Sequence, residues 1–486
     1  MSAQYLRPTH QKVTALAALI FLSGCTVGPT YTRPEVPLPA AYTKGEQQAE
    51  GAAMLQYEWW KLYNDAVLNT LVEGTLSNSR DLQKAIAQMD EAAAVLGSTS
   101  ANLLPQINLD GNSSRARSST LNAQPLPPGT PIISNSQRLV LSTAFEIDLW
   151  GKLQRASEAA RAQLLGSRYA HDVMAITLTG AASQTYFTLR SLDAQIALTT
   201  QTLALRDEAV TVVTSRLNGG LASALDLNQA QLSRSEAALQ LHELQRQRQL
   251  AENQLGLISG TPGLNIAATA ESTLPTAIRP PVGLPSTLVE RRPDVKQAEQ
   301  MLIAANARIG VTKAAQLPSF SLTGILGGQS SELSDILNSG ARIWSLGLRA
   351  TMPLFDAGKL SARTREAEAV QQQALANYQK TVETAFKEVA DALTNTEQSS
   401  VSVADLQARA DAARNALRLA QMRYDAGYSS YLEVLDAQRT HNSATQALIQ
   451  NSQAQLLYNI DLMKALGGGW NAENLPAAPV ANNSRS

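Results

Sequence analysis

The chain has 486 residues and a formal net charge of −1 at pH 7, with 44% hydrophobic and 5% aromatic residues. A nearly neutral chain has no electrostatic field that favours nucleic acid, and a single cysteine excludes an internal disulfide. Ala, Gln, Leu and Thr dominate its middle part, a composition that favours long helices with thin seams over one thick globular core.

Residues 1–24 have the pattern of an export signal. Arg7 and Lys12 precede the apolar run 13–22, which is too short to span a bilayer. The run ends in LSGC, which resembles a bacterial lipobox, and in that pattern the signal is cut before Cys25. We therefore expect lipid attachment at Cys25, where several acyl chains would give stable anchoring to a membrane.

Residues 25–60 begin with a stretch rich in Pro and small residues, and we interpret them as a lipid-anchored tether. Trp59 and Trp60 stand where the folded part begins, as packing anchors. At the other end, a run of glycines begins at Gly467, and residues 467–486 are expected to form a polar C-terminal tail.

Between these ends the chain contains one unit twice. Gly427, in YDAGYSSYLEVLDAQR, follows Gly220, in LNGGLASALDLNQAQ, by 207 positions, and Leu432 follows Leu225 by the same interval. Each glycine lies between long proline-free segments, which is typical of the tip of a helical hairpin. We therefore expect repeats at 61–260 and 286–466, joined by the Pro-rich linker 261–285.

Each repeat predicts the same order of elements, namely a helix, two strands and a long helical hairpin. Alternating apolar and polar residues predict β-hairpins at 106–149 and 319–354, with polar loops over 113–137 and 329–341. The tips of the helical hairpins are expected near 218–226 and 425–436. The 68 residues between Gly358 and Gly427 contain no Gly or Pro, enough for roughly 100 Å of helix.

Two side-chain patterns predict how these elements pack. Apolar residues at alternating spacings of four and three give the long second helix a coiled-coil seam, at Leu406, Ala410, Ala413, Leu417, Ala420 and Tyr424. Trp344, Leu346 and Leu348 alternate with polar residues, as in a lipid-facing barrel strand. Four strands are too few to close a barrel, for which about eight is the minimum. Two or three chains must therefore share one.

Several motifs together resemble the outer-membrane factors of tripartite efflux pumps, and within them the OprM-type lipoproteins. They occur in the expected order over nearly the whole chain: 25–34 (CTVGPTYTRP), 145–152 (FEIDLWGK), 223–231 (SALDLNQAQ), 288–295 (LVERRPDV), 304–322 (AANARIGVTKAAQLPSFSL), 386–393 (FKEVADAL), 431–439 (YLEVLDAQR) and 464–470 (KALGGGW).

The resemblance implies an α+β membrane protein of the TolC-like fold with two structural repeats per chain. It also implies a homotrimer in the bacterial outer membrane, with a shared 12-stranded β-barrel and a long α-helical barrel that extends into the periplasm. The implied partners are outer-membrane lipid, a periplasmic adaptor (membrane fusion protein) and an inner-membrane pump of the resistance–nodulation–division (RND) type. The implied function is a passive exit duct for drugs or other toxic small molecules.

In such ducts, residues at the second hairpin tip close the periplasmic end. The matching positions are Leu432, Asp436 and Arg439, with Glu433 close to Asp436 on the same helix. Symmetry would gather several copies of each side chain at the axis, and rings of carboxylates and apolar groups make a constriction. A solvated helix face is the alternative interpretation for Glu433 and Asp436.

Two further positions match residues that latch one hairpin to another in some relatives, namely Tyr424 and Asp226. A partner arginine of those relatives corresponds to Ser429 here, so the latch network would be incomplete. Tyr424 can equally be a packing residue that continues the seam of the long helix.

Nothing in the sequence predicts an enzyme. The four histidines, His10, His171, His242 and His441, have no metal-ligand spacing, and there is no phosphate-binding loop or nucleophile motif. We therefore expect no catalytic residue, no metal site and no cofactor apart from the lipid on Cys25, and energy for transport must come from a partner.

Three other functions stay open. Within the same fold the chain could be a heavy-metal cation efflux duct or a type I secretion duct. In a different class, it could be a structural lipoprotein that spans the periplasm without conducting.

Overall fold

A computed structural model describes residues 26–39, 58–119, 129, 131–269, 274–278 and 291–468. The expected signal peptide, Cys25, residues 40–57 of the expected tether, residues 270–273 and 279–285 of the expected linker and the expected tail from residue 469 lie outside the described residues. The chain forms two compact units. The first comprises the N-terminal segment to Glu35 with Asp90–Gly166 and Ala298–Tyr378, and the second comprises the remaining segments. Both units therefore draw on both sequence repeats.

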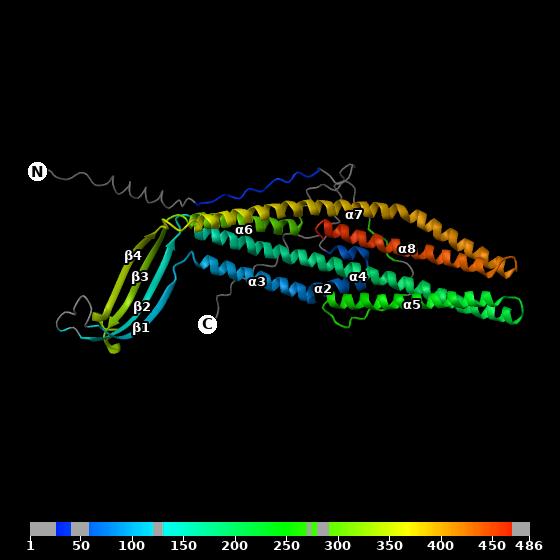
Figure 1. The fold of residues 1–486 in the computed structure, drawn as a ribbon, viewed down its shortest axis with the longest axis horizontal. Coiled ribbons are helices and arrows are strands. Elements are labelled where there is room, and N and C mark those ends of the chain that lie inside the picture. Colours follow the sequence, from blue (N-terminus) through cyan, green and yellow to red (C-terminus); the bar gives the residue numbers. More distant parts are fainter. Residues whose placement is uncertain are drawn as a thin grey trace. The chain divides into compact units, whose positions relative to one another are not determined.

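The first unit contains an antiparallel sheet in the order β1-β2-β3-β4 (Figure 1). Its strands are β1 (Ile107–Arg117), β2 (Ile133–Ile147), β3 (Ser319–Ser330) and β4 (Arg342–Thr351). The central β2–β3 pair joins the two repeats, with Gln137 opposite Ser330 at one end and Ile147 opposite Phe320 at the other.

The first hairpin is longer than its apolar alternation predicts. Strands β1 and β2 continue into the stretch 113–137, which was expected to be a loop, and pair Ser113 with Gln137 and Arg117 with Ile133. Apart from Ala116 and Ile133, the side chains of this part are polar, and all are exposed or half-buried, so hydrophobic alternation does not mark it. Backbone N–H and C=O groups alone continue the ladder. In the second hairpin, the connection contains the short helices η4 (Leu333–Asp335) and η5 (Ser339–Ala341).

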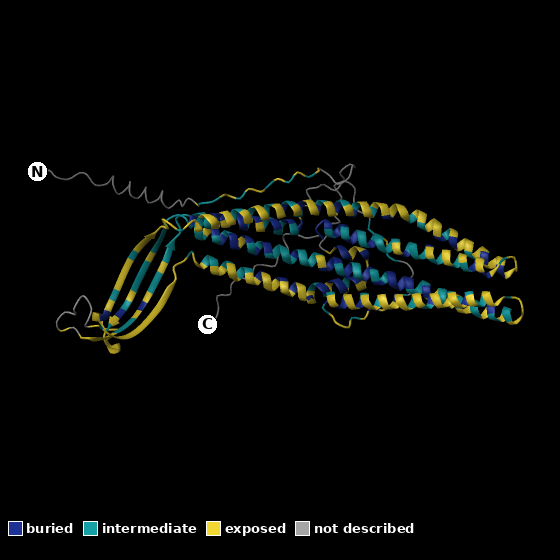
Figure 2. Ribbon diagram, viewed as in Figure 1, coloured by how far each residue is buried: buried dark blue, intermediate teal, exposed yellow. Residues whose placement is uncertain are grey.

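One face of the sheet is apolar across all four strands. The register places Leu109 opposite Leu141, Leu141 opposite Leu326, and Leu326 opposite Trp344. Leu109, Leu141, Leu326 and Trp344 are exposed. The outer strands β1 and β4 are exposed along most of their length, as Figure 2 shows. The sheet therefore has an uncovered apolar face and two open edges.

The segment after residue 25 is held against the first unit by close backbone packing. The N–H of Val27 donates to the carbonyl of Trp150 at 3.0 Å, and the amide of Asn306 donates to the carbonyl of Pro29 at 2.9 Å. A Cβ at Gly28 would lie 2.5 Å from the Cα of Gly310, so both positions need glycine for this contact. Residues 26–33 are called the N-terminal strap below.

The helices show the repeat in their lengths. Both α4 (Lys152–Asn218) and α7 (Lys359–Asp425) have 67 residues, and both α5 (Ala224–Ile258) and α8 (Tyr431–Ala465) have 35. The other helices are η2 (Trp59–Tyr63), α2 (Ala66–Asn78), α3 (Arg80–Ala101) and α6 (Pro293–Ala314). Among the described residues, no helix combines the length and the apolar character that a membrane span needs.

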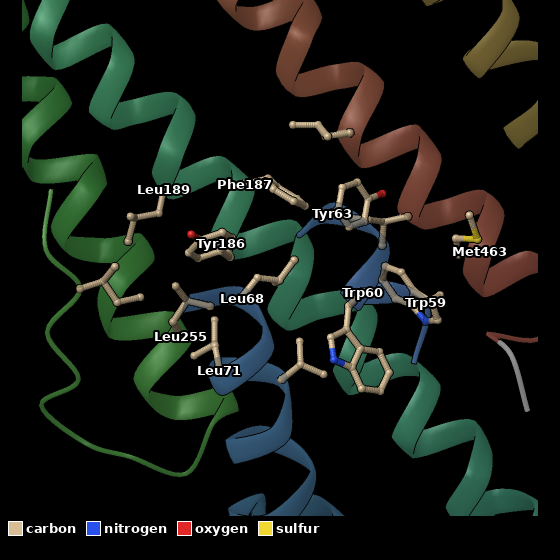
Figure 3. Packing of buried hydrophobic residues seen from close by; sticks show 14 residues of the cluster. Trp59, Trp60, Tyr63, Leu68, Leu71, Tyr186, Phe187, Leu189, Leu255 and Met463 are labelled. Carbon is tan, nitrogen blue, oxygen red and sulfur yellow. The ribbon is translucent and has the colours of Figure 1, made fainter. Parts of the chain in front are cut away.

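The core of the second unit is an aromatic cluster between η2, α2, α4, α5 and α8 (Figure 3). Trp59 and Trp60 are 1% and 3% exposed, and their rings meet edge to face. The hydroxyl of Tyr63 donates to Asn459 at 2.5 Å, and that of Tyr186 donates to Asp65 at 2.6 Å. Buried aromatic residues with bonded hydroxyls fix the short N-terminal helices on the long ones.

The expected seam of α7 is visible in its burial. Ala410, Ala413, Ala420 and Tyr424 are buried, while Leu406 and Leu417 are half-buried. Ala410 and Ala413 form one cluster with Ala444 of α8. These small side chains let α7 and α8 approach closely along the hairpin.

Candidate functional site

The candidate site lies at the two hairpin tips, which belong to the second unit. At the first tip, Gly220 has a φ of 71°, and the N–H of Leu221 donates to the carbonyl of Arg216 at 2.8 Å. At the second, Gly427 has a φ of 78°, and the N–H of Tyr428 donates to the carbonyl of Arg423 at 2.8 Å. Both long helices therefore end in the same glycine-dependent turn.

The return helices begin differently. Ser223 and Asp226 form a capping box at the start of α5, in which the Ser223 N–H donates to the Asp226 carboxylate at 2.9 Å. Ser430 precedes α8 without a side-chain cap. Glu433 is the repeat equivalent of Asp226, and its carboxylate lies 3.3 Å from the guanidinium of Arg423 instead. Glu433 therefore joins the two helices of its own hairpin.

Tyr424 joins the two hairpins to each other. Its ring is 9% exposed, and the guanidinium of Arg216 in α4 lies 4.4 Å from the ring centroid. The ring of Tyr431 lies 5.4 Å away on the other side of the tip turn. Val213 and Ala230 of the first hairpin complete this cluster with Val434 of the second.

A groove of about 270 Å³ runs between α4, α5 and α8 next to this cluster. Repeat-equivalent positions face it from α5 and α8, so Gln229 corresponds to Asp436 and Leu232 to Arg439. Its charged residues are Asp436 and Arg439 of α8, and Arg206 and Glu236 of the first hairpin. The lining residues are Arg206, Gln229, Leu232, Ser233, Glu236, Leu432, Leu435, Asp436 and Arg439.

Burial and hydrogen bonding set the electrostatics of the tips. Burial lowers the pKa of Arg206, although the carboxylate of Glu236 acts in the opposite direction. Burial also raises the pKa of Tyr431 above its ordinary value. The backbone N–H and hydroxyl of Ser223 hold the pKa of Asp226 below its ordinary value. The Asp226 carboxylate is therefore charged and already bonded within its own helix end.

The four predicted gate residues share one property, which is exposure in the single chain. Leu432 is 57% exposed, and Glu433, Asp436 and Arg439 are also exposed. Leu432, Asp436 and Arg439 line the same groove, whereas Glu433 is paired with Arg423 on its own hairpin. The chain alone does not bring these side chains to a constriction, so their gate role stays a prediction.

The two predicted latch residues have different partners. Tyr424 contacts Arg216, and Asp226 bonds to Ser223. Sequence reasoning missed Arg216, although the repeat interval of 207 relates it to Arg423, and each arginine lies two residues before the end of its helix. The hydroxyl of Ser429 has no hydrogen-bond partner among the described residues.

Among the described residues, no group of three or more His, Cys, Asp or Glu side chains is arranged to hold a metal ion. Two of the polar contacts at the tips instead connect helices, namely the Arg423–Glu433 ion pair and the Arg216–Tyr424 cation–π contact. The Ser223–Asp226 capping box closes the start of α5.

Comparison with known proteins identifies the class of molecule. Residues 71–261 and 284–468 match the family model described as "Outer membrane efflux protein". The chain belongs to this family. The two matched segments correspond to the two repeats.

Individual relatives cover almost the whole chain. The chain is 35% identical to the outer membrane protein OprJ of Pseudomonas aeruginosa over 468 residues, covering 94% of this chain and 96% of OprJ. It is 33% identical to the toluene efflux pump outer membrane protein TtgI of Pseudomonas putida, covering 94% and 98%. It is also 33% identical to the cation efflux system protein CusC of Escherichia coli O6:H1, covering 94% and 99%.

A solved structure of CusC superposes on the chain with a TM-score of 0.81 and 31% identity, covering 91% of this chain and 100% of that one. The expected TolC-like fold is thus confirmed. The protein is an outer-membrane efflux channel of this family, and it is a channel protein and not an enzyme.

Proposed function

We propose that the chain is the exit duct of a tripartite efflux pump, which passively conducts drugs or other toxic small molecules from the periplasm to the outside. The observation that carries this proposal is that a chain of the outer membrane efflux protein family contains both a pair of long helical hairpins and an incomplete sheet. The sheet would form part of a membrane pore, and the hairpins would form the periplasmic conduit.

Three copies would complete the molecule. Four strands from each would make a shared 12-stranded barrel, and the hairpins of three chains would make a helical barrel. The open edges of β1 and β4 support this assembly, because exposed strand edges bind further strands. A periplasmic adaptor and an inner-membrane RND-type pump would supply the energy.

The gate would lie at the second hairpin tips. Asp436 and Arg439 are exposed on α8, and Leu432 precedes Asp436 by about one helical turn. Repetition of these side chains around an axis would produce charged and apolar rings that narrow the channel. Within the described residues, Asp436 has no ion-pair partner in its own chain, so its carboxylate is available to such a ring.

The lipid on Cys25 is the second anchor in this proposal. The N-terminal strap begins one residue after Cys25 and is bonded to Trp150, directly after the sheet. Acyl chains at this position would therefore lie beside the strands that enter the membrane. The intact mass of the purified chain would include these acyl chains, and the mass of an uncleaved, unmodified chain would contradict lipidation.

The names of the relatives point to two substrate classes. TtgI is a protein of a toluene pump and CusC of a cation efflux system, and both are 33% identical to this chain. We favour small organic molecules, because proteins named for solvent, toluene and antibiotic efflux are all among the relatives that are 33% identical to this chain. Loss of the gene should then sensitise cells to solvents or drugs, and sensitisation to heavy-metal cations alone would favour the cation duct.

The gate is tested by substitution of its carboxylates. Asp436→Ala combined with Glu433→Ala should raise the conductance of the closed channel severalfold in planar bilayers and sensitise cells to vancomycin, because the acidic ring is removed. Gln229→Ala is the matched control, since Gln229 occupies the equivalent position of the first repeat and carries no charge.

Unchanged conductance in the double variant would remove both carboxylates from the gate. Because the Glu433 carboxylate is paired with Arg423, the single variant Glu433→Ala should raise the conductance less than Asp436→Ala does. A wild-type protein that never conducts, with or without these substitutions, would instead favour a structural lipoprotein. Loss of protein secretion without any loss of solute resistance would favour a type I secretion duct.

A further inference from the structure

The apolar face of the sheet ends in arginine on both outer strands, at the end of the sheet away from the helices. On this face, Arg115 and Arg117 are the last residues of β1, and Arg342 is the first residue of β4. Successive side chains of a strand point to opposite faces, so Arg342 shares a face with Trp344, and Arg117 with Leu109. All three arginines are exposed, as are the outer strands as a whole (Figure 2).

Charged residues are divided unequally between the two faces of the sheet. Within the four described strands, the carboxylates are Asp110 and Glu146, and both lie on the opposite, polar face. The connection 118–132 contains no charged residue, and Glu332 and Asp335 belong to the connection between β3 and β4. None of the three guanidinium groups bonds to another described residue. Their positive charge is therefore available to an anion from outside the chain.

The length of the strands places these arginines at the border of a membrane. Ile107 begins β1, and Met352 directly follows β4, so both mark the helix end of the apolar face. Arg117 lies ten residues from Ile107, and Arg342 lies ten residues from Met352. Ten residues at a rise of ~3.4 Å and a tilt of ~40° cover roughly 26 Å along a barrel axis, close to the ~25 Å apolar band of such barrels. The arginines therefore lie at the level of the lipid headgroups.

The identity of these headgroups rests on the proposed function, in which the long helices extend into the periplasm. The strand ends that adjoin the helices then face the periplasm, and the arginine ends face the outer leaflet. Because β1 and β4 are the edge strands of the sheet, a barrel shared by several copies would gather arginines of two chains at each junction. The outer leaflet of a bacterial outer membrane differs from the inner one in consisting mainly of a phosphorylated glycolipid.

We propose that Arg115, Arg117 and Arg342 bind the phosphate groups of this outer-leaflet glycolipid. A guanidinium group matches the geometry of a phosphate with two parallel N–H donors. Trp344, two residues from Arg342 on the same face, is 79% exposed and supplies the amphipathic ring that is typical of a membrane interface. The acyl chains of the bound glycolipid would cover exposed apolar side chains of the same face, such as Leu346. Three copies would provide three such sites.

Titration of the purified complex with diphosphoryl lipid A, followed by native mass spectrometry in mild detergent, tests this site. The wild-type complex should bind lipid A, and the combined variant Arg115→Gln, Arg117→Gln and Arg342→Gln should bind it roughly a hundredfold more weakly. This estimate corresponds to about fivefold for each basic residue at an anionic surface. Monophosphoryl lipid A, which lacks one phosphate, should bind the wild-type complex more weakly than the diphosphoryl form.

Arg349→Gln is the matched control. Arg349 is also exposed on β4 but belongs to the polar face, so its loss should leave lipid A binding unchanged. Arg342→Lys keeps the charge without the planar fork, and it should weaken binding less than Arg342→Gln does. These single variants on β4 give the answer even if the combined variant fails to assemble.

Two results would overturn the glycolipid site. One is equal lipid A binding by the wild type, Arg342→Gln and Arg349→Gln, and the other is equal binding of lipid A and phosphatidylglycerol by the wild type. Either result, in a complex that still conducts in planar bilayers, would leave the exit-duct proposal standing. A wild-type chain that neither assembles nor conducts would contradict the exit duct, and the glycolipid site with it.

Discussion

Asp226 and Glu433 occupy equivalent positions of the two repeats, but their carboxylates have different partners. Asp226 closes a capping box with Ser223, whereas Glu433 contacts Arg423 across its own hairpin. A capping box is worth about 1 kcal/mol to a helix end, and an exposed ion pair is worth about 0–1 kcal/mol. The second tip is therefore held less tightly by its own polar groups than the first, as the proposed gate role requires.

The contact between Arg216 and Tyr424 can be tested at the scale of single residues. Arg216→Gln should increase hydrogen–deuterium exchange of the backbone around Gly427, because a cation–π contact worth roughly 0.5–1 kcal/mol holds the second tip on the first. Tyr424→Phe keeps the aromatic face and should leave exchange unchanged.

The matched control is Arg423→Gln, which removes the repeat equivalent of Arg216 and breaks only the ion pair with Glu433. Arg423→Gln should increase hydrogen–deuterium exchange around Gly427 less than Arg216→Gln does, because it leaves the contact between the two hairpins intact. Equal exchange in wild type and Arg216→Gln would contradict a role for this contact in holding the tips together.

Sequence reasoning located the tip residues but not all of their partners. The spacing of seam residues marked Tyr424 as a packing position, and its burial agrees. The stacking of Arg216 on this ring could not be derived, because it depends on how two hairpins far apart in the sequence pack side by side. Likewise, the latch interpretation of Asp226 did not include the hydrogen bond that its carboxylate accepts from the backbone N–H of Ser223.

At the scale of elements, the N-terminal strap is the least expected feature. Its backbone lies against α6 at Gly310, where an added Cβ would come within 2.7 Å of the carbonyl oxygen of Val27. The side chains of Tyr31 and Arg33 meet Glu299 at 3.1 and 3.5 Å. Burial, together with the charge of Glu299 and the hydrogen bond to it, raises the pKa of Tyr31. An irregular segment is thus held by backbone contacts on one side and an ionic cluster on the other.

A pair of glycine variants tests this packing. Gly97 and Gly310 both lie inside helices, where Gly→Ala alone should stabilise by about 0.5–1 kcal/mol. A Cβ at Gly97 meets nothing within 4 Å, so Gly97→Ala should raise the melting temperature. Gly310→Ala should lower it and expose residues 26–33 to proteases, since the new Cβ collides with backbone.

If Gly310→Ala raised the melting temperature as much as Gly97→Ala, the strap would not be packed against α6. Protease sensitivity of residues 26–33 gives the same answer independently of overall stability, because it reports on the strap alone.

The long helices and the strand pattern were readable because each follows one dominant signal. Helices α4 and α7 coincide with stretches that lack proline, and β4 coincides with the alternation from Trp344 to Leu348. The outer parts of β1 and β2 carry mostly polar side chains, so backbone pairs such as Arg115 with Asn135 show no alternation of apolar and polar residues in the sequence.

At the scale of the whole chain, the sequence repeats and the compact units divide the molecule differently. Each repeat runs through a helix, a hairpin of strands and a hairpin of helices, while each compact unit gathers parts of both repeats. Each of the long helices α4 and α7 belongs partly to both units, and the division falls after Gly166 in α4 and after Tyr378 in α7.

The sheet is the part of the chain that is incomplete in a single copy. Its two edges are open and its apolar face is exposed, in a family of outer-membrane efflux channels. Identical copies of the chain would supply strand edges that match these. Within one chain, β2 of the first repeat already pairs with β3 of the second repeat.

Native mass spectrometry of the protein extracted in mild detergent tests this requirement most directly. We predict a complex of three chains that dissociates only on heating or in strong denaturant. A folded single chain, stable in detergent and free of bound copies, would contradict the account.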